Sequence, residues 1–198
     1  MPYSPAHKRQ TRLNIVRSAR RLFNRHGFTE VSIDQIMAEA GLTRGGFYNH
    51  FANKEELYIE VMEDYAEERR EAVAGQPAPC GTGTALEIAR AYMAGELLDD
   101  IESQCPLVTV PSDVSRTTPA VRAAYQRVFE ALAGMFQANL TDLPPDAARR
   151  EALNLGATCV GAMVLARTVE DRALADEIRE AALAQAEAIT AGKAEMAA

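Results

Sequence analysis

The sequence contains no run of about 20 apolar residues, the length that a helix needs to cross a bilayer. No apolar stretch follows the basic residues near its start, as a secretory signal would require. The three cysteines, Cys80, Cys105 and Cys159, form no Cys-x-x-Cys pair and no metal-ligand spacing with the three histidines. These absences predict a cytoplasmic protein with no membrane segment, no metal site and no disulfide framework.

Signatures of catalysis are also missing. We find no nucleophile with a plausible base, no metal-binding cluster and no glycine-rich phosphate loop after a strand. The alternation of apolar and polar residues that marks a strand is absent, whereas apolar residues recur at helical spacing. We therefore expect an all-α protein that is not an enzyme, has no catalytic residues and needs no cofactor.

Acidic residues are scarce in the first part of the chain. Residues 1–54 hold nine Lys or Arg against three Asp or Glu, which leaves a net charge of +6. Residues 55–198 hold 12 basic residues against 25 acidic ones, which leaves −13. This asymmetry indicates that one end of the chain is built to bind a polyanion and the other is not.

The basic part contains the most informative stretch, residues 32–51, which predicts two short helices joined at Gly41. Ser32 is a good N-cap, and Gln35 three residues later completes a capping box. Apolar residues then follow at helical spacing until Gly41, which supplies the tight turn that ends the first helix.

The second of these helices is predicted over residues 43–51, with Phe47 and Phe51 pointing inward. Its opposite face is basic, small and rich in hydrogen-bonding groups, which suits the major groove of DNA. Gly45 and Gly46 each cost a helix about 1 kcal/mol relative to alanine, so their presence indicates a backbone that approaches a partner closely. A solvated polar face is the alternative for these residues, and a helical interaction module that does not bind DNA is the alternative for the protein.

Residues 28–57 closely resemble the DNA-binding signature of TetR-type transcriptional regulators. The matching stretch runs from Phe28-Thr29-Glu30 to Leu57, and its centre is Gly41-Leu42-Thr43-Arg44-Gly45-Gly46-Phe47-Tyr48-Asn49-His50-Phe51. The resemblance is specific over about residues 8–60 and elsewhere rests on length and helical character. It implies a helix-turn-helix DNA-binding domain of three helices over residues 1–53. It also implies an effector-binding and dimerisation domain over residues 54–198, which begins with a connecting helix, 54–74.

Each exposed residue of the motif has an expected role on double-stranded DNA. Arg44 is the best base reader, because its guanidinium can hold O6 and N7 of a guanine. Thr43 and Asn49 contact bases or phosphates, and Tyr48 contacts a phosphate or a thymine methyl group. The expected phosphate contacts are His50, Lys54, the backbone at Gly45 and Gly46, and Ser32, which also caps its helix. In TetR-type proteins the matching positions of the second and third helices make these contacts with bases and phosphates.

Helical patterns continue on both sides of the motif. A first helix is expected over 6–26, with five arginines (Arg12, Arg17, Arg20, Arg21 and Arg25) mostly off its apolar stripe and available to solvent or phosphate. Asn53 caps a helix that runs to about Val73, and a linker rich in glycine and proline follows over 75–84. Further helices are predicted over 84–102, 106–115, 119–140, 145–170 and 174–190.

Small residues along 145–170 and a helical stripe on 174–190 favour a four-helix interface between two copies of the chain. Such a homodimer matches a palindromic operator, whereas ordinary packing within one chain is the alternative. The resemblance further implies an effector pocket among the helices. Its candidate lining residues, mostly apolar, favour an apolar or aromatic ligand; they are Tyr92, Met93, Leu97, Cys105, Tyr125, Phe129, Asn154 and Met163.

Cys105 supports a second hypothesis within regulation. It precedes Pro106 at the start of a predicted helix, where the pKa of a thiol can be lowered and its reactivity raised. Some regulators of the TetR type are similar in carrying a cysteine near this place, and in some of them the thiol reacts with oxidants or electrophiles. A repressor that senses electrophiles through Cys105 is therefore the alternative to a repressor released by a bound ligand, and a packed apolar thiol is the simplest interpretation.

Overall fold

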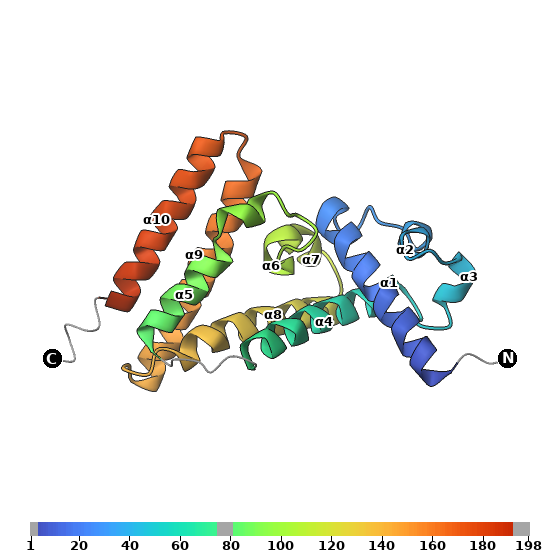
Figure 1. Ribbon diagram of the computed structural model, residues 1–198, viewed down its shortest axis with the longest axis horizontal. Helices are drawn as coiled ribbons and strands as arrows, with labels where there is room; N and C mark the ends of the chain where they lie inside the picture. Colours follow the sequence, from blue (N-terminus) through green and yellow to red (C-terminus); the bar gives the residue numbers. More distant parts are fainter. Residues whose placement is uncertain (1–3, 75–80, 192–198) are drawn as a thin grey trace. The chain divides into compact units, whose positions relative to one another are not determined.

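The computed structural model describes residues 4–74 and 81–191, and its regular elements are all helices over these ranges, which confirms the all-α prediction (Figure 1). The chain divides into two compact units. Unit 1 combines the residues up to Arg69 with Ile101–Val128, and unit 2 combines Arg70–Asp100 with the residues from Phe129 onward. Over the described ranges, no helix has both the length and the apolar character needed to span a membrane.

The first helix, α1 (Pro5–His26), begins and ends where its sequence predicts. The hydroxyl of Ser4 accepts the N–H of His7 at 3.2 Å and caps the start. Gly27 ends the helix with φ +81°, and its N–H donates to the carbonyl of Phe23 at 2.9 Å. The buried face carries the predicted apolar stripe of Ile15, Val16, Ala19 and Phe23.

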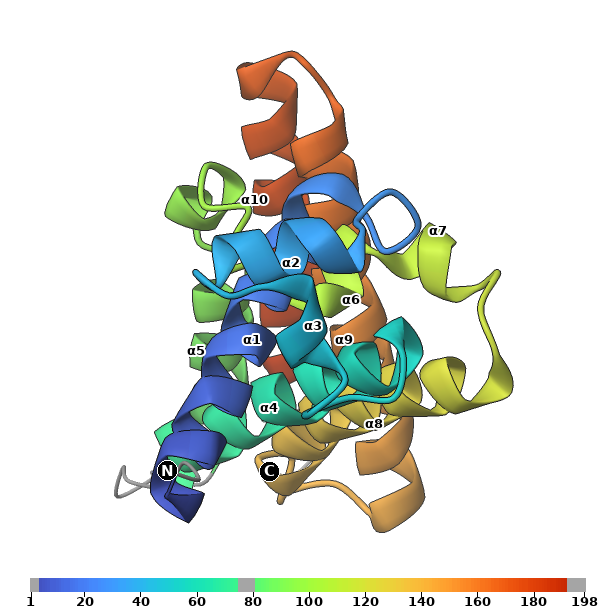
Figure 2. The same cartoon turned by 90° about the vertical axis from the view of Figure 1, so that its right-hand side faces the viewer.

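The helix α2 (Ile33–Glu39) confirms the predicted capping box. Gln35 donates its N–H to the Ser32 hydroxyl at 3.2 Å, and its side-chain oxygen accepts the N–H of Ser32 at 2.8 Å. Gly41 follows with φ +70°, the left-handed conformation expected of the residue that turns the chain. α2 packs on α1, and α3 packs on α2 (Figure 2).

The helix α3 (Arg44–Phe47) is shorter than the predicted span of 43–51. Thr43 occupies the N-cap position with extended backbone, but its side chain makes no capping hydrogen bond. Beyond Phe47 the chain continues in tight turns, in which Asn49 donates to the carbonyl of Gly46 at 3.2 Å and His50 to that of Phe47 at 2.9 Å. Two adjacent glycines give a helix too little intrinsic stability to hold a longer regular run here.

The helix α4 (Lys54–Ala74) starts as predicted, with the side-chain oxygen of Asn53 accepting the N–H of Glu56 at 2.8 Å. Its buried face meets α1 through an aromatic cluster. The ring of Tyr58 lies 5.0 Å from that of Phe23 and 4.5 Å from that of Phe28. The predicted linker over 75–84 falls largely outside the described residues, as does Cys80.

Two single-turn helices, α6 (Pro106–Thr109) and α7 (Pro111–Val114), replace the one helix predicted over 106–115. Pro111 lacks an N–H and disfavours helical backbone in the residue before it, so the chain breaks at Val110, where φ is −131°. α6 packs on α1 within unit 1. The same unit contains the first half of α8 (Pro119–Ala138).

Unit 2 contains α5 (Thr82–Tyr92), the short 3-10 helix η1 (Gly95–Leu98), the rest of α8, α9 (Pro145–Thr168) and α10 (Arg172–Ala191). α10 packs along α9 and α5 (Figure 1). The helix predicted over 84–102 is interrupted after Tyr92, and side chains of α10 bind carbonyl groups in the segment that follows. Arg179 donates to the carbonyl of Met93 at 2.8 Å, and Arg172 donates to that of Gly95 at 3.5 Å.

Candidate nucleic-acid interface

The face of α3 and of the turn after it lies open to solvent, as the sequence predicts. The side chain of Arg44 is 60% exposed and Tyr48 is 57% exposed. Thr43, Gly45 and Asn49 are exposed beside them. On the opposite side, two phenylalanines, Phe47 and Phe51, are fully buried, with their ring centroids 5.6 Å apart. A polar, basic surface therefore sits on an apolar base that fixes its orientation.

The paired glycines differ in their surroundings. A methyl group at Gly45 would meet no atom within 4 Å, so the backbone there is open on its outer side. A methyl group at Gly46 would lie 3.5 Å from Cε of Met37, in ordinary contact with α2. The backbone at Gly45 therefore has no side chain or neighbouring atom that would keep a partner away.

Arg44, the expected base reader, pairs with Asp34 at 2.6 Å in this structure. Both side chains are more than half exposed, so the pair contributes little to stability and opens readily. It connects the start of α3 with the first turn of α2, next to Ser32. Ser32 is itself exposed, and both its N–H and its hydroxyl donate to the side-chain oxygen of Gln35 at 2.8 Å.

Lys54 has a structural role that the sequence did not suggest. Its ammonium group donates to the carbonyls of Phe28 at 2.8 Å, Val31 at 2.9 Å and Thr29 at 3.3 Å. Burial lowers the pKa of Lys54, and the charges of Glu30 and Asp113 act in the opposite direction. Lys54 therefore fastens the turn between α1 and α2 to the start of α4, so its predicted contact with a phosphate would have to break these bonds.

His50 is half-buried at the end of the recognition turn, residues 48–51. Burial lowers the pKa of its imidazole below the ordinary value of 6.5, and the positive charges of Lys8 and Arg12 lower it further. Its Nδ1 is buried without a hydrogen-bond partner among the described residues. Its main-chain carbonyl is engaged by Arg12.

Four of the five arginines predicted to lie mostly off the apolar stripe of α1 form ion pairs, although the side chains of Arg21 and Arg25 remain 40% and 51% exposed, so the availability of these arginines to solvent or phosphate stays a prediction. Arg12 pairs with Glu60, Arg20 with Glu68 at 2.6 Å, Arg21 with Glu39 at 3.1 Å, and Arg25 with Glu102. The positive charge of residues 1–54 is thus partly compensated by acids of other elements. These arginines hold α1 to its neighbours, a role that local sequence patterns do not indicate because most of the partners lie far along the chain.

Buried polar contacts also connect α1 with the segment before α8. The side-chain nitrogen of Asn24 donates to the carbonyls of Glu102 and Gln104, each at 2.9 Å, and its oxygen accepts the hydroxyl of Thr109 at 2.8 Å. Nearby, the carboxylate of Asp113 accepts the N–H of Phe28 at 2.8 Å. Sequence analysis missed Asn24 and Asp113, because neither lies in a recognisable motif and their partners are 78 to 85 positions away.

The residues predicted to line an effector pocket are divided between the two units. Cys105, 7% exposed, and Tyr125, which donates to the carbonyl of Leu107 at 3.1 Å, belong to unit 1. The remaining six belong to unit 2, where Met93 and Met163 are fully buried and Asn154 is exposed and bonded to Glu151 at 3.1 Å. Half-buried side chains complete the set: Tyr92, Leu97 and Phe129. The exposure of Asn154 argues against a place in a pocket.

Comparisons with known proteins match both parts of the chain. Residues 15–61 match the family described as bacterial regulatory proteins, tetR family, and residues 84–188 match the C-terminal domain of LmrA/YxaF-like transcriptional regulators. The transcriptional regulator LmrA of Bacillus subtilis is 24% identical over 167 residues, which cover 81% of this chain and 88% of LmrA. The TetC protein of transposon Tn10 from Escherichia coli is 47% identical over 49 residues, a quarter of the length of each protein.

The fold agrees with these matches. A TetR-family regulator from Cytophaga hutchinsonii superposes with a TM-score of 0.77 over 97% of this chain and 98% of its own, at 20% sequence identity. At that identity the likeness shows the fold alone, and the membership rests on the sequence matches. The chain belongs to the TetR family of bacterial transcriptional regulators, and its C-terminal part is of the LmrA/YxaF-like type.

Proposed function

We propose that this protein is a homodimeric repressor that binds a palindromic operator in the cytoplasm and leaves it when a small-molecule effector binds. Regulators of the TetR family bind operator DNA and small-molecule effectors, typically as dimers, and most are ligand-responsive repressors. The observation that carries the proposal here is the exposed face from Thr43 to Asn49 on its buried apolar base. Its relatives are regulators, a class that is generally not enzymatic.

On DNA, some of the exposed residues would contact bases and others would contact phosphates. Arg44 would leave Asp34 and read a guanine, and Thr43, Tyr48 and Asn49 would contact neighbouring bases or phosphates. The main chain at Gly45 is open enough to reach a phosphate. Ser32, Gly46, His50 and Lys54 would complete the phosphate contacts, although the bonds of Lys54 to three carbonyls favour a structural role for that residue.

The two-fold symmetry of a palindrome calls for two copies of the chain, and α9 and α10 offer the surface. Leu165 of α9 is 56% exposed and Leu174 of α10 is 43% exposed, although both are large apolar side chains. A methyl group at Gly161 of α9 would meet no atom within 4 Å, so small residues there leave room for another helix. These features support a dimer interface formed by α9 and α10.

An effector bound in unit 2 would meet mainly apolar side chains, such as Met93, Phe129 and Met163, which favours an apolar or aromatic ligand. Its binding shifts the protein away from the DNA-bound state only if it binds the other state more tightly. Operator release therefore requires that the ligand distinguish two arrangements of the helices.

The proposal is tested with the duplex that the protein selects from random-sequence DNA. We expect a palindrome with half-site centres about 34–36 Å apart, because each α3 enters one of two successive major grooves. Inserting five base pairs between the half-sites turns them to opposite faces of the duplex and should weaken binding by about a hundredfold or more. Fluorescence anisotropy over a range of salt concentrations measures both affinity and salt dependence. Binding that is indifferent to the spacing, or no selected sequence at all, would contradict the proposal.

Thiol sensing by Cys105 is the second candidate, and one observation favours it. Asn24 of α1 donates to the carbonyls of Glu102 and of Gln104, the residue directly before Cys105, so a chemical change at Cys105 would disturb a contact with α1. The burial of Cys105, which is only 7% exposed, works against rapid modification.

If Cys105 is the sensor, a thiol-reactive compound such as N-ethylmaleimide should release the wild-type protein from its selected duplex. The Cys105→Ser variant should then bind normally and be at least about tenfold less responsive, because the serine hydroxyl is a far weaker nucleophile. The matched control is Cys159→Ser, which removes a fully buried thiol whose pKa burial raises to about 12. An unchanged response of Cys105→Ser would remove this candidate.

A further inference from the structure

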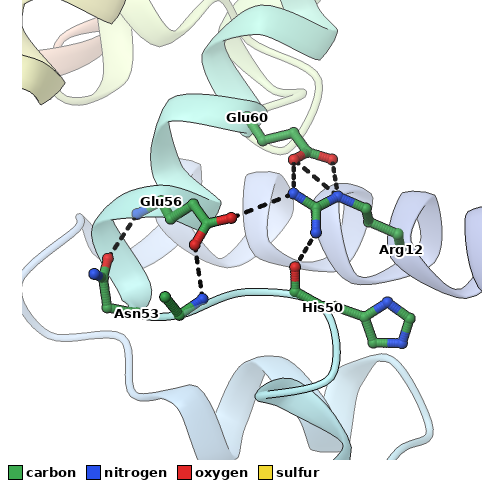
Figure 3. Close-up of polar contacts among 6 residues, drawn as sticks. Arg12, His50, Asn53, Glu56 and Glu60 are labelled. Carbon is green, nitrogen blue, oxygen red and sulfur yellow. Dashed lines mark hydrogen bonds and ion pairs between the residues drawn. The ribbon is translucent and has the colours of Figure 1, made fainter.

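Within unit 1, the guanidinium group of Arg12 joins α1 to α4 and to the recognition turn (Figure 3). Its Nε donates to both carboxylate oxygens of Glu60 on α4, at 2.8 and 3.0 Å, and its Nη2 donates to the same carboxylate. Its remaining nitrogen, Nη1, donates to the carbonyl of His50 in the recognition turn. The fork geometry of arginine makes this triple use possible, and the positive charge strengthens each bond.

Two further contacts hold the recognition turn, one made by Arg12 and the other by Glu56. The guanidinium of Arg12 stacks 4.0 Å above the ring of Phe51, the residue that closes the turn. Glu56 accepts the N–H of Ala52 at 2.7 Å and lies 3.6 Å from Arg12 (Figure 3). The end of the turn is thus fixed to α1 and to the first two turns of α4 at once.

We propose that Arg12 and Glu60 are positioning residues for DNA recognition, which hold the recognition turn after α3 in its binding geometry without touching DNA. This inference rests on the proposed function and adds to it the means by which α4 controls that turn. Glu60 lies on α4 and binds the guanidinium of Arg12, which in turn binds the carbonyl of His50. A displacement of α4 therefore changes the positions of Tyr48 and Asn49 in the recognition turn. Preorganisation of this kind raises affinity by removing the ordering cost at binding.

The proposal predicts that neutralising Glu60 weakens DNA binding, whereas charge repulsion alone predicts that it strengthens DNA binding. Removing an acidic charge from a DNA-binding unit should tighten binding to a polyanion. Replacing Glu60 by glutamine should instead weaken binding to the selected duplex by about tenfold, because a neutral amide cannot hold the guanidinium with two charged hydrogen bonds. Glu63→Gln is the matched control: it removes the same charge from the same helix, where Glu63 is exposed and pairs with Arg127 at 2.8 Å. Its affinity should equal or exceed that of the wild type.

A second variant, Arg12→Lys, separates positioning from phosphate contact. Lysine keeps the charge but cannot bond Glu60 and the His50 carbonyl in the same geometry, so affinity should again fall by about tenfold with the salt dependence unchanged. A residue that contacts phosphate would tolerate this replacement. Wild-type affinity in Arg12→Lys, or equal or tighter binding by Glu60→Gln, would therefore overturn the proposal.

Amide hydrogen exchange of the free protein provides a readout that does not depend on DNA. Exchange over residues 48–53 should be faster in Glu60→Gln and Arg12→Lys than in wild type and Glu63→Gln, while α10 exchanges as before. If the wild type selects no duplex, the proposed function fails, and the exchange data still decide whether this cluster holds the turn. Unchanged exchange in both variants would refute it.

Discussion

Replacing Gly27 by alanine is expected to lower the free energy of unfolding by about 3 kcal/mol, a large share of the roughly 5–15 kcal/mol that stabilises a typical domain. Two effects add. The backbone at Gly27 has φ +81° and ψ 165°, a region that is essentially restricted to glycine and costs other residues about 1–3 kcal/mol. A Cβ at this position would also lie 2.5 Å from Oδ2 of Asp113, the oxygen that accepts the N–H of Phe28. Moving that carboxylate leaves the N–H without its acceptor.

Gly41→Ala is the matched control for this prediction. Gly41 has φ +70°, but a methyl group added there would have no atom within 4 Å, so only the conformational cost of about 1–2 kcal/mol applies. Urea denaturation at one fixed protein concentration measures both variants. In an Asp113→Ala background the additional cost at Gly27 should disappear, because the contact is gone. Equal destabilisation by the two glycine replacements would show that the contact with Asp113 contributes nothing.

The Gly45→Ala variant is expected to lose at least about tenfold in operator affinity without becoming less stable. In the free protein the added methyl group meets nothing, and alanine favours the helix by up to about 1 kcal/mol. On DNA, the same methyl group would keep the backbone of α3 from a phosphate, and each tenfold loss of affinity corresponds to about 1.4 kcal/mol.

Gly134→Ala controls for the gain in helix propensity, because Gly134 of α8 is exposed and also has open space around it. Both variants should unfold at or above the wild-type urea concentration, and only Gly45→Ala should bind the selected duplex more weakly. If Gly45→Ala binds like the wild type, close approach of this backbone to DNA is excluded and the paired glycines have another origin.

The features that the sequence predicted well are governed by residues a few positions apart. The capping box of Ser32 and Gln35, the turn at Gly41 and the cap of Asn53 each depend on hydrogen bonds across three or four residues. Such bonds require only the local order of the residues, which the sequence contains. The inward orientation of the two phenylalanines of the motif follows in the same way from helical spacing.

Two features that the sequence did not predict concern bonds between side chains and distant backbone groups. The helix expected over 84–102 is interrupted where Arg172 and Arg179 of α10 bind carbonyls more than 75 positions away. Likewise, the turn after α3 is held by Arg12, whose bond to the carbonyl of His50 spans 38 positions. A local pattern cannot reveal such partners, so the bond that holds this turn and the ion pairs of α1 emerge only from the fold.

The bonds from α1 and the turn after it to Glu102, Gln104, Thr109 and Asp113 have a consequence for protein engineering. A chimera made by grafting only the N-terminal helices onto the body of another regulator would leave the amide of Asn24 and the N–H of Phe28 facing foreign loops. A working chimera of this protein should therefore contain two separate stretches of its sequence together, the N-terminal helices and Ile101–Val128.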